Sequence, residues 1–266
     1  MLMAQVSDLH VCAPGQRLGG VVDTNGMAQA CVRALLAQRP RPQALLLTGD
    51  LVESGGPVPY RHLLDLLAPI DWPVYPLAGN HDERGALIEA LGPRMGPHGG
   101  LLPGFLQYAA AIGPLRLLAL DTVVPFKPYG ALCAQRLAWL ADRLAEDDRP
   151  VVIAMHHPPF VTGIGHMDAM GLREGAAELE ALVRRHPQVQ AVLCGHVHRA
   201  IHTAFGGVPA SVCPSPAHQI ALSLPGGGAD GFAMEPPGYQ LHLWQAGRLV
   251  SHTVPIGDFG GTKPFD

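Results

Sequence analysis

The sequence predicts an α/β protein in which two β-sheets pack as a sandwich flanked by helices. In the first two-thirds of the 266-residue chain, apolar strand-like runs alternate with amphipathic helical segments, the pattern of α/β layering. After Val197 the pattern changes to short β segments joined by glycine-rich turns such as Gly206-Gly207. Polar residues follow directly on several strand-like runs, and the carboxyl ends of strands in an open α/β sheet meet at one crevice.

Five predicted strands each lead into a short polar motif. The strands cover residues 2–6, 44–47, 74–78, 151–155 and 189–194. The motifs that follow them, in the same order, are Asp8-Leu9-His10, Gly49-Asp50, Gly79-Asn80-His81-Asp82, His156-His157 and Gly195-His196-Val197-His198. We therefore expect a metal site at the carboxyl ends of these strands, although its residues are far apart in the sequence.

The remaining elements follow from hydrophobic periodicity and from turn residues. Helices are predicted over residues 24–38, 60–67, 133–146 and 175–185, and further strands over 201–205, 208–213, 239–245 and 248–254. Two Gly- and Pro-rich stretches, 92–104 and 225–231, are predicted loops. No interdomain linker is apparent, so residues 1–266 are predicted to form a single domain with a β-rich part from about residue 200 and a loosely ordered tail at 257–266.

The donor atoms of the five motifs favour a transition metal. Asp8-x-His10 and His196-x-His198 would present both side chains to one ion if the chain were extended, because alternate residues of a strand face the same way. The donors are imidazole nitrogens and carboxylate or amide oxygens without a thiolate, which suits Mn, Fe, Zn, Co or Ni. An ion of this kind could activate water, so no serine or cysteine nucleophile would be required.

In kind and order, the motifs resemble the signature of the calcineurin-like metallophosphoesterase superfamily: D-x-H, G-D, G-N-H-D/E, an isolated His and G-H-x-H. Three segments make the chain most similar to the bacterial branch of cyclic-nucleotide phosphodiesterases and glycerophosphodiesterases. They are Ser7-Asp8-Leu9-His10, Met155-His156-His157-Pro158-Pro159 and Cys194-Gly195-His196-Val197-His198. The resemblance extends over about residues 2–220, and the role of the segment beyond is left open. It implies the αββα architecture of that superfamily.

The resemblance also implies a dinuclear centre of two divalent transition-metal ions, Fe, Mn, Zn or Co. One ion would be held by Asp8, His10 and His198 and the other by Asn80, His156 and His196, with Asp50 bridging them. Such a centre would activate a hydroxide for attack on a phosphoester. His81 would face the scissile phosphate as a catalytic residue, and Asn80 and His218 would also contact substrate. Asp82 fits the role of holding the His81 imidazole in one tautomer.

Most of the other histidines need no chemical role. The chain has 14 histidines, and six of them stand outside every motif and are predicted to lie on the surface or to pack: His62, His98, His186, His202, His242 and His252. His157 follows a predicted ligand in a strand, so it would face the opposite way and serve structure. His166 stands in a glycine-bearing loop just after a strand. The sequence leaves open whether His166 or His157 contacts substrate.

Composition limits the partners. The net charge is −4, and no basic run or basic-aromatic interleaving is present, so a long nucleic acid is not an expected substrate. No apolar stretch approaches the ~20 residues of a membrane span, and the first strand begins too early for a leader peptide. Five cysteines without a Cys-x-x-Cys are not a disulfide framework. We expect a cytoplasmic enzyme without a membrane partner, and the resemblance implies a possible homo-oligomer.

Hydrolysis of a small phosphodiester is the predicted function, with 3',5'-cAMP or a glycerophosphodiester as substrate. The alternatives are a broad-specificity phosphomonoesterase, a nuclease of the same superfamily, and a non-catalytic scaffold, which would be expected to lose ligands. No Arg or Lys lies within the five motifs, and the nearest are Arg84 and Arg199. Because monoester phosphatases commonly clamp the extra anionic oxygens with such a cation, we expect diesters to be preferred.

Overall fold

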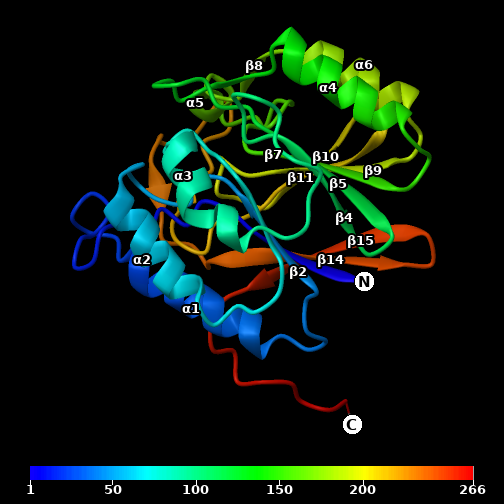
Figure 1. Cartoon of the computed structure of the whole chain (residues 1–266). Helices are drawn as coiled ribbons and strands as arrows, with labels where there is room; N and C mark the ends of the chain where they lie inside the picture. Colours follow the sequence, from blue (N-terminus) through cyan, green and yellow to red (C-terminus); the bar gives the residue numbers. More distant parts are fainter. Residues whose placement is uncertain (266) are drawn as a thin grey trace.

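A computed structural model describes residues 1–265 and contains two main β-sheets packed face to face (Figure 1). The five-stranded sheet has the order β15-β14-β1-β2-β3 and the six-stranded sheet the order β10-β11-β9-β7-β5-β4. The first contains β1 (Leu2–Val6), β2 (Ala44–Thr48), β3 (Val74–Leu77), β14 (Gly238–Gln245) and β15 (Arg248–Pro255). The second contains β4 (Tyr108–Ile112), β5 (Leu115–Leu120), β7 (Val151–Met155), β9 (Val189–Cys194), β10 (Ile201–Phe205) and β11 (Val208–Val212).

Within each sheet, the strands that lead into the predicted motifs run parallel to one another. Strands β1, β2 and β3 run parallel, as do β5, β7, β9 and β11. The antiparallel strands are β4 and β10 at the two edges of the six-stranded sheet, and β14, which pairs with β1 on one side and with the edge strand β15 on the other. Two short pairs complete the β-structure: β6 (Gly130–Ala131) with β8 (Leu172–Glu174), and β12 (Gln219–Ile220) with β13 (Phe232–Ala233). The carboxyl ends of five parallel strands thereby reach the same region of the molecule.

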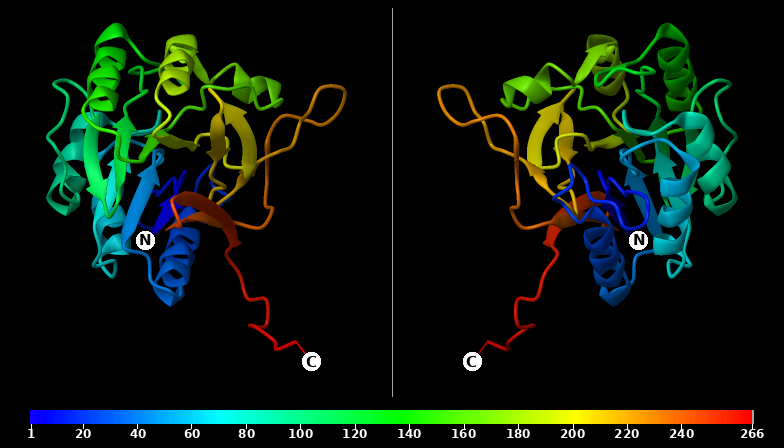
Figure 2. Two further views of the ribbon diagram at one scale, coloured as in Figure 1. Left: turned by 90° about the vertical axis from the view of Figure 1, so that its right-hand side faces the viewer. Right: turned by 90° about the vertical axis from the view of Figure 1, so that its left-hand side faces the viewer.

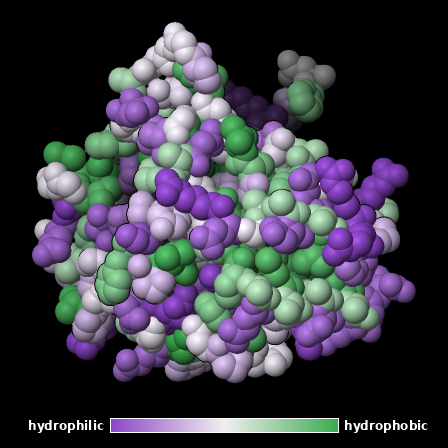
Figure 3. Space-filling view, turned by 90° about the horizontal axis from the view of Figure 1, so that it is seen from above, coloured by the Kyte–Doolittle hydropathy of each residue, from purple (hydrophilic) through white to green (hydrophobic). Residues whose placement is uncertain are grey.

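Helices cover the outer face of each sheet, which completes the predicted helix–sheet–sheet–helix layering. Helices α1 (Thr24–Ala37), α2 (Pro57–Leu67) and α3 (Arg84–Leu91) pack on the side of the five-stranded sheet, and α4 (Ala134–Ala145) and α6 (Ala176–Arg185) on the six-stranded sheet (Figure 1). The short α5 (Gly165–Asp168) and the 3-10 turn η1 (Gly92–Arg94) lie in loops. Seen from above, apolar residues are scattered among polar ones (Figure 3).

The alternation of side chains along the strands of the six-stranded sheet separates two apolar clusters. In β5, Leu117 and Ala119 pack into the core between the sheets, while Leu118 and Leu120 pack under α4 and α6. β7 and β9 alternate in the same way. Because such strands are buried on both faces, they are continuously apolar, and each fully buried leucine contributes about 1.5–3 kcal/mol.

Most predicted elements are present to within a residue or two at each end, apart from α2, which begins three residues earlier. Among the elements that were not predicted are β4, β5 and α3. Strand β4 reads Tyr-Ala-Ala-Ala-Ile, and alanine is a poor strand former. Helix α3 begins after Glu83, whose carboxylate caps Gly85 N and Ala86 N, and glutamate is not among the preferred N-cap residues.

The C-terminal segment 257–265 contains no helix or strand and is exposed. It leads away from the body of the protein (Figure 2). None of the helices in the described part of the chain has the length and apolar character needed to cross a membrane.

Candidate metal centre

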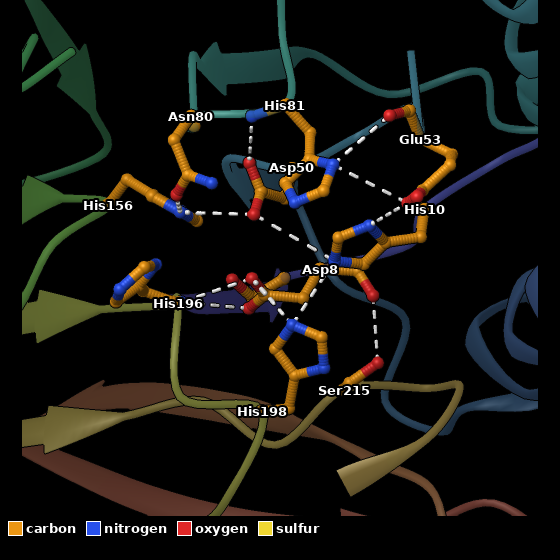
Figure 4. A network of polar contacts seen from close by, with 12 residues as sticks. Asp8, His10, Asp50, Glu53, Asn80, His81, His156, His196, His198 and Ser215 are labelled. Carbon is orange, nitrogen blue, oxygen red and sulfur yellow. Dashed lines mark hydrogen bonds and ion pairs between the residues drawn. The ribbon is translucent and has the colours of Figure 1, made fainter. Parts of the chain in front are cut away.

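All seven predicted ligands meet at the carboxyl ends of the strands that precede them (Figure 4). Asn80 is half-buried, and the other six are buried: Asp8, His10, Asp50, His156, His196 and His198. Glycines in the motifs make this convergence possible. A Cβ at Gly79 would collide with Asp50, and one at Gly195 would collide with Ser7 Oγ. The glycines therefore leave the space into which the neighbouring side chains fit.

The backbone of the ligand-bearing turns is left-handed, which the sequence analysis did not anticipate. Positive φ angles occur at five predicted ligands: Asp8 (57°), His10 (45°), Asp50 (48°), His196 (73°) and His198 (54°). The expectation that Asp8-x-His10 and His196-x-His198 present their side chains from extended chain is therefore wrong. Non-glycine residues pay a cost on the order of 1–3 kcal/mol for such a conformation, and it is concentrated here where the side chains must converge.

Hydrogen bonds to the backbone hold these turns in place. The N–H of Asp8 donates to the carbonyl of Gly49 and that of His10 to the carbonyl of Asp50, both at 2.9 Å. The hydroxyl of Thr24 donates to the His10 carbonyl and that of Ser215 to the Asp8 carbonyl, both at 2.7 Å. The strain is thus compensated by contacts from parts of the chain distant in sequence.

His10 and His198 form an arrangement that fits a cation. His10 Nδ1 lies 2.8 Å from Glu53 Oε2, and His198 Nδ1 lies 3.1 Å from the carbonyl oxygen of His218. Both oxygens only accept, so Nδ1 of each ring is the donor, and a ring with a single proton carries its lone pair on Nε2. The two Nε2 atoms are 3.1 Å apart. Lone pairs this close repel each other unless a cation attracts both, and Asp8 Oδ1, 3.4 Å from His198 Nε2, adds negative charge.

His156, Asn80 and His196 form a second group of donors. His156 Nδ1 lies 2.7 Å from the Thr48 carbonyl, so its Nε2 faces Asn80 Oδ1 at 3.2 Å. Both ring nitrogens of His196 are buried and have no hydrogen-bond partner in the described part of the chain. Burial and the charge of His156 lower the pKa of His196 to about 3, which keeps this ring neutral and able to donate a lone pair.

Asp50 lies between the two groups. Its Oδ2 is 3.4 Å from His156 Nε2 and 3.8 Å from His10 Nε2, while its Oδ1 accepts a hydrogen bond from the His81 backbone N–H. Burial alone would lower the pKa of His156, but the Asp50 carboxylate outweighs it and raises the pKa to about 9. The same attraction overcomes burial and holds the pKa of Asp50 well below its ordinary value. A bound cation would take the place of that proton.

Comparison with known proteins agrees with this geometry. Residues 1–200 match the family model described as calcineurin-like phosphoesterase. This chain belongs to the calcineurin-like phosphoesterase family. It is 34% identical to a probable glycerophosphodiester phosphodiesterase of Arcobacter nitrofigilis, over 100% of this chain and 97% of that protein. It is 36% identical to a probable cyclic nucleotide phosphodiesterase of a Synechococcus species, over 89% and 88% of the two chains.

Further relatives place the phosphoesterase among hydrolases of phosphoester bonds. Its buried His/Asp cluster suggests a divalent metal centre. A cAMP/cGMP dual specificity phosphodiesterase of Mycobacterium tuberculosis is 32% identical over 96% of this chain and 80% of its own length. Among solved structures, a dimetal phosphatase from Danio rerio shares the fold with a TM-score of 0.65 at 16% identity, covering 97% of this chain and 99% of that one.

Asp82 does not contact the His81 ring, so the expectation that it fixes the tautomer of His81 is wrong. The Asp82 carboxylate accepts hydrogen bonds from the backbone N–H groups of Gly79, Leu51 and Val52 and from the hydroxyl of Tyr60. Burial, followed by the Asp50 charge, raises its pKa to about 6. These bonds join the loops after β2 and β3, which is a structural function.

Glu53 takes the place that the sequence analysis gave to Asp82. Its backbone carbonyl lies 3.0 Å from His81 Nδ1, and its carboxylate lies 3.5 Å from the same atom (Figure 4). The sequence offered no signal for this residue beyond its position three residues after Asp50. It was missed because the path of the loop, and not the spacing, brings it to both histidines.

The histidines around the centre differ in their surroundings. His157 has both ring nitrogens engaged, with Thr122 Oγ1 at 2.8 Å and the Pro128 carbonyl at 3.3 Å, so it serves structure. His166 Nδ1 lies 2.8 Å from Asp230 Oδ1, and this histidine does not line the cavity at the metal centre. His218 does line it, packs its ring against His198 at 4.6 Å, and leaves its buried Nδ1 without a partner in the described residues.

A cavity of about 230 Å³ opens onto the metal centre. Its lining includes the polar residues His81, Glu53, Asn80 and His218 and five apolar residues that we call the apolar wall: Leu18, Pro128, Met167, Met170 and Ile220. Ile220 belongs to β12, at the base of the hairpin that projects from the body in Figure 2. No Lys or Arg of the described chain lines this cavity. A ligand here would meet both the predicted metal ligands and the apolar wall.

Proposed function

We propose that the chain is a dinuclear metal-dependent phosphodiesterase that hydrolyses small diesters, such as 3',5'-cyclic nucleotides or glycerophosphodiesters. The observation that carries the proposal is the pair of donor groups that share Asp50 beside a cavity without a lysine or arginine. In the proposed assignment Asp8, His10 and His198 hold one ion, Asn80, His156 and His196 hold the other, and Asp50 bridges. When bound, two divalent ions would supply Lewis acidity and lower the pKa of a water.

The chain's own residues would bind and orient the diester. Among the described residues, His81 Nδ1 is engaged by Glu53 and nothing bonds its Nε2, which leaves that nitrogen to meet a phosphoryl or leaving-group oxygen. His218 and Asn80 reach the same cavity and would contact the non-bridging oxygens. The apolar wall excludes water from the organic part of the substrate.

The two arginines closest to the motifs are occupied elsewhere. Arg84 forms a bidentate ion pair with the buried Asp121, at 2.5 Å and 3.0 Å. Arg199 contacts Glu235 at 2.8 Å and the Ile220 carbonyl at 2.6 Å. Neither lines the cavity, so neither supplies the clamp that a dianionic monoester would use. This supports a diester substrate over the alternative of a broad-specificity phosphomonoesterase.

A comparison of matched substrates tests this preference. With the same metal loaded, we expect kcat/KM for bis(nitrophenyl) phosphate to exceed that for nitrophenyl phosphate by about tenfold or more, which corresponds to at least ~1.4 kcal/mol. The reason is that no Lys or Arg of the described cavity lining neutralises the second anionic oxygen of the monoester. A tenfold preference for the monoester would contradict the proposal. In that case Arg84→Gln and Arg199→Gln would show whether one of these arginines moves to the substrate.

Met170 tests the role of the apolar wall. Both Met170 and Met167 line the cavity, but Met170 is half-buried, whereas Met167, in α5, is buried and also packs in the core. We expect Met170→Ala to raise KM for bis(nitrophenyl) phosphate about three- to tenfold with little change in kcat, because it removes apolar contact with the ester group. Methyl nitrophenyl phosphate, with its smaller second group, should be affected less. An equal effect on both substrates would remove Met170 from substrate recognition.

A cytoplasmic location, a possible homo-oligomer and a single domain over residues 1–266 stay predictions, as does the identity of the metals. Fe, Mn, Zn and Co all suit the donor set.

A non-catalytic scaffold is disfavoured because every predicted ligand position still carries a residue that can donate to a metal. Hydrolysis of cyclic AMP and of glycerophosphocholine by the metal-loaded protein would separate the two substrate classes.

A further inference from the structure

Glu53 contacts two functional histidines at once. Its Oε2 lies 2.8 Å from His10 Nδ1 and 3.5 Å from His81 Nδ1, and its backbone carbonyl lies 3.0 Å from His81 Nδ1 (Figure 4). The rings of His10 and His81 meet edge to face, with centroids 4.7 Å apart. Three ligating atoms from these three residues therefore form one compact group at the mouth of the centre.

The backbone fixes Glu53 at this position. Its N–H donates to the Val11 carbonyl at 3.0 Å, and the Val11 N–H donates to the Leu51 carbonyl at 3.1 Å. These bonds join the loop after β1 to the loop after β2, which carry His10 and Asp50. The Glu53 side chain is about one-third exposed, at 31%, so solvent reaches it on the side away from His10. No lysine or arginine of the described chain lies in its ion-pair contacts, which are with the two histidines alone.

We propose that Glu53 is a positioning residue that couples the metal ligand His10 to the substrate-facing His81. This proposal rests on the proposed function for the role of His81, but its effect on His10 stands on the contact alone. The carboxylate orients the His10 ring and strengthens its donor nitrogen, while the carbonyl of the same residue orients His81. One residue thus sets the relative position of a metal ligand and of the group that meets the leaving oxygen.

The location of the protons follows from the partners. A carbonyl oxygen and a carboxylate oxygen only accept hydrogen bonds, so His10 and His81 both carry a proton on Nδ1. Nε2 of His10 is then the atom directed at the metal centre, 3.8 Å from Asp50 Oδ2. A carboxylate on the far nitrogen of a metal-binding histidine makes the ring a stronger donor, and removing it typically lowers metal affinity by about 10- to 100-fold.

Substitutions at Glu53 separate its charge from its hydrogen bond. Glu53→Gln keeps the size and an acceptor oxygen but removes the charge, and Glu53→Ala removes both. Glu89→Gln is a matched control because Glu89 is an exposed glutamate on α3 without a partner in the described chain. Calorimetric titration of each metal-free protein with Mn²⁺ or Zn²⁺ measures affinity without turnover. Nitrogen-15 NMR of the histidine rings in the metal-free protein reports the tautomers.

We expect Glu53→Ala to weaken one of the two binding events about 10- to 100-fold and to leave the other within about threefold. The His10 ring should lose its uniform Nδ1–H tautomer, while His81 should keep it because the backbone carbonyl remains. The metal affinity of Glu53→Gln should lie between those of the wild type and Glu53→Ala, and the metal affinity of Glu89→Gln should match that of the wild type. With saturating metal, kcat of Glu53→Ala should decrease by a larger factor than KM increases.

Two results would overturn the inference: metal affinities of Glu53→Ala within about twofold of the Glu89→Gln control, or an unchanged His10 tautomer. These readouts do not depend on the substrate. If the wild-type protein binds metal yet hydrolyses no diester, the proposed function fails while the Glu53–His10 coupling can still be judged. If diesters are hydrolysed but the Glu53 variants bind metal as tightly as the wild type, only the proposed coupling of Glu53 to His10 fails.

Discussion

Replacing Asp50 with alanine is expected to remove nearly all bound metal and nearly all turnover. Its carboxylate approaches both donor groups, at 3.4 Å from His156 Nε2 and 3.8 Å from His10 Nε2. Without it, the lone pairs of both groups lose the negative charge that balances two cations. The loss in kcat should exceed the roughly 10²–10³-fold typical for one transition-state donor. Metal analysis of the purified variant, together with circular dichroism to check folding, measures the effect.

Asn80→Ala provides the comparison within the same centre. Asn80 reaches only His156 among the other predicted ligands, at 3.2 Å, and an amide oxygen is a weaker donor than a carboxylate. We expect this variant to lose chiefly one metal and to keep the other. Comparable metal loss in Asp50→Ala and Asn80→Ala would contradict the bridging assignment of Asp50.

The His81→Ala variant should keep its metal content near wild type and lose about 10²- to 10⁴-fold in kcat, the usual range for loss of a positioned proton donor. The ring of His81 contacts Glu53, and His81 lines the cavity. Its contact with Asp50 is made by the backbone N–H of the residue, not by the ring. Alanine retains that N–H, so the centre itself should survive. Measurement of kcat alongside metal content separates the two roles.

A substrate series makes the role of His81 more specific. If His81 protonates the leaving oxygen, His81→Ala should lose far more activity toward a diester with a poor alkoxide leaving group than toward one with nitrophenolate, which leaves without a proton. A uniform loss across leaving groups would point to charge stabilisation instead. Activity close to wild type with every substrate would remove His81 from the mechanism.

The strands and the ligand set could be predicted because each rests on a local pattern. A continuous apolar run such as Val151–Met155 specifies a strand buried on both faces, and its last residue places His156 at the edge of the sheet. The rule that carboxyl ends of parallel strands share one edge then brings such motifs together without knowledge of the loops. Helix α3 and strands β4 and β5 were not assigned from the sequence. An uncommon glutamate cap and a run of alanines conceal two of them.

The sequence by itself determined the donor atoms, their chemistry and the edge of the sheet at which they meet. Only the tertiary structure decided how they are held. The left-handed turns at Asp8 and His196 depend on hydrogen bonds from segments far along the chain. The partners of Asp82 and Glu53 depend on how the loops after β2 and β3 pack against each other. The Asp82 carboxylate, adjacent to His81 in sequence, bonds to the backbone, while the carbonyl and the carboxylate of Glu53 lie at the His81 ring. A side chain's type is local information, but its partner is set by packing between segments that the sequence does not order in space.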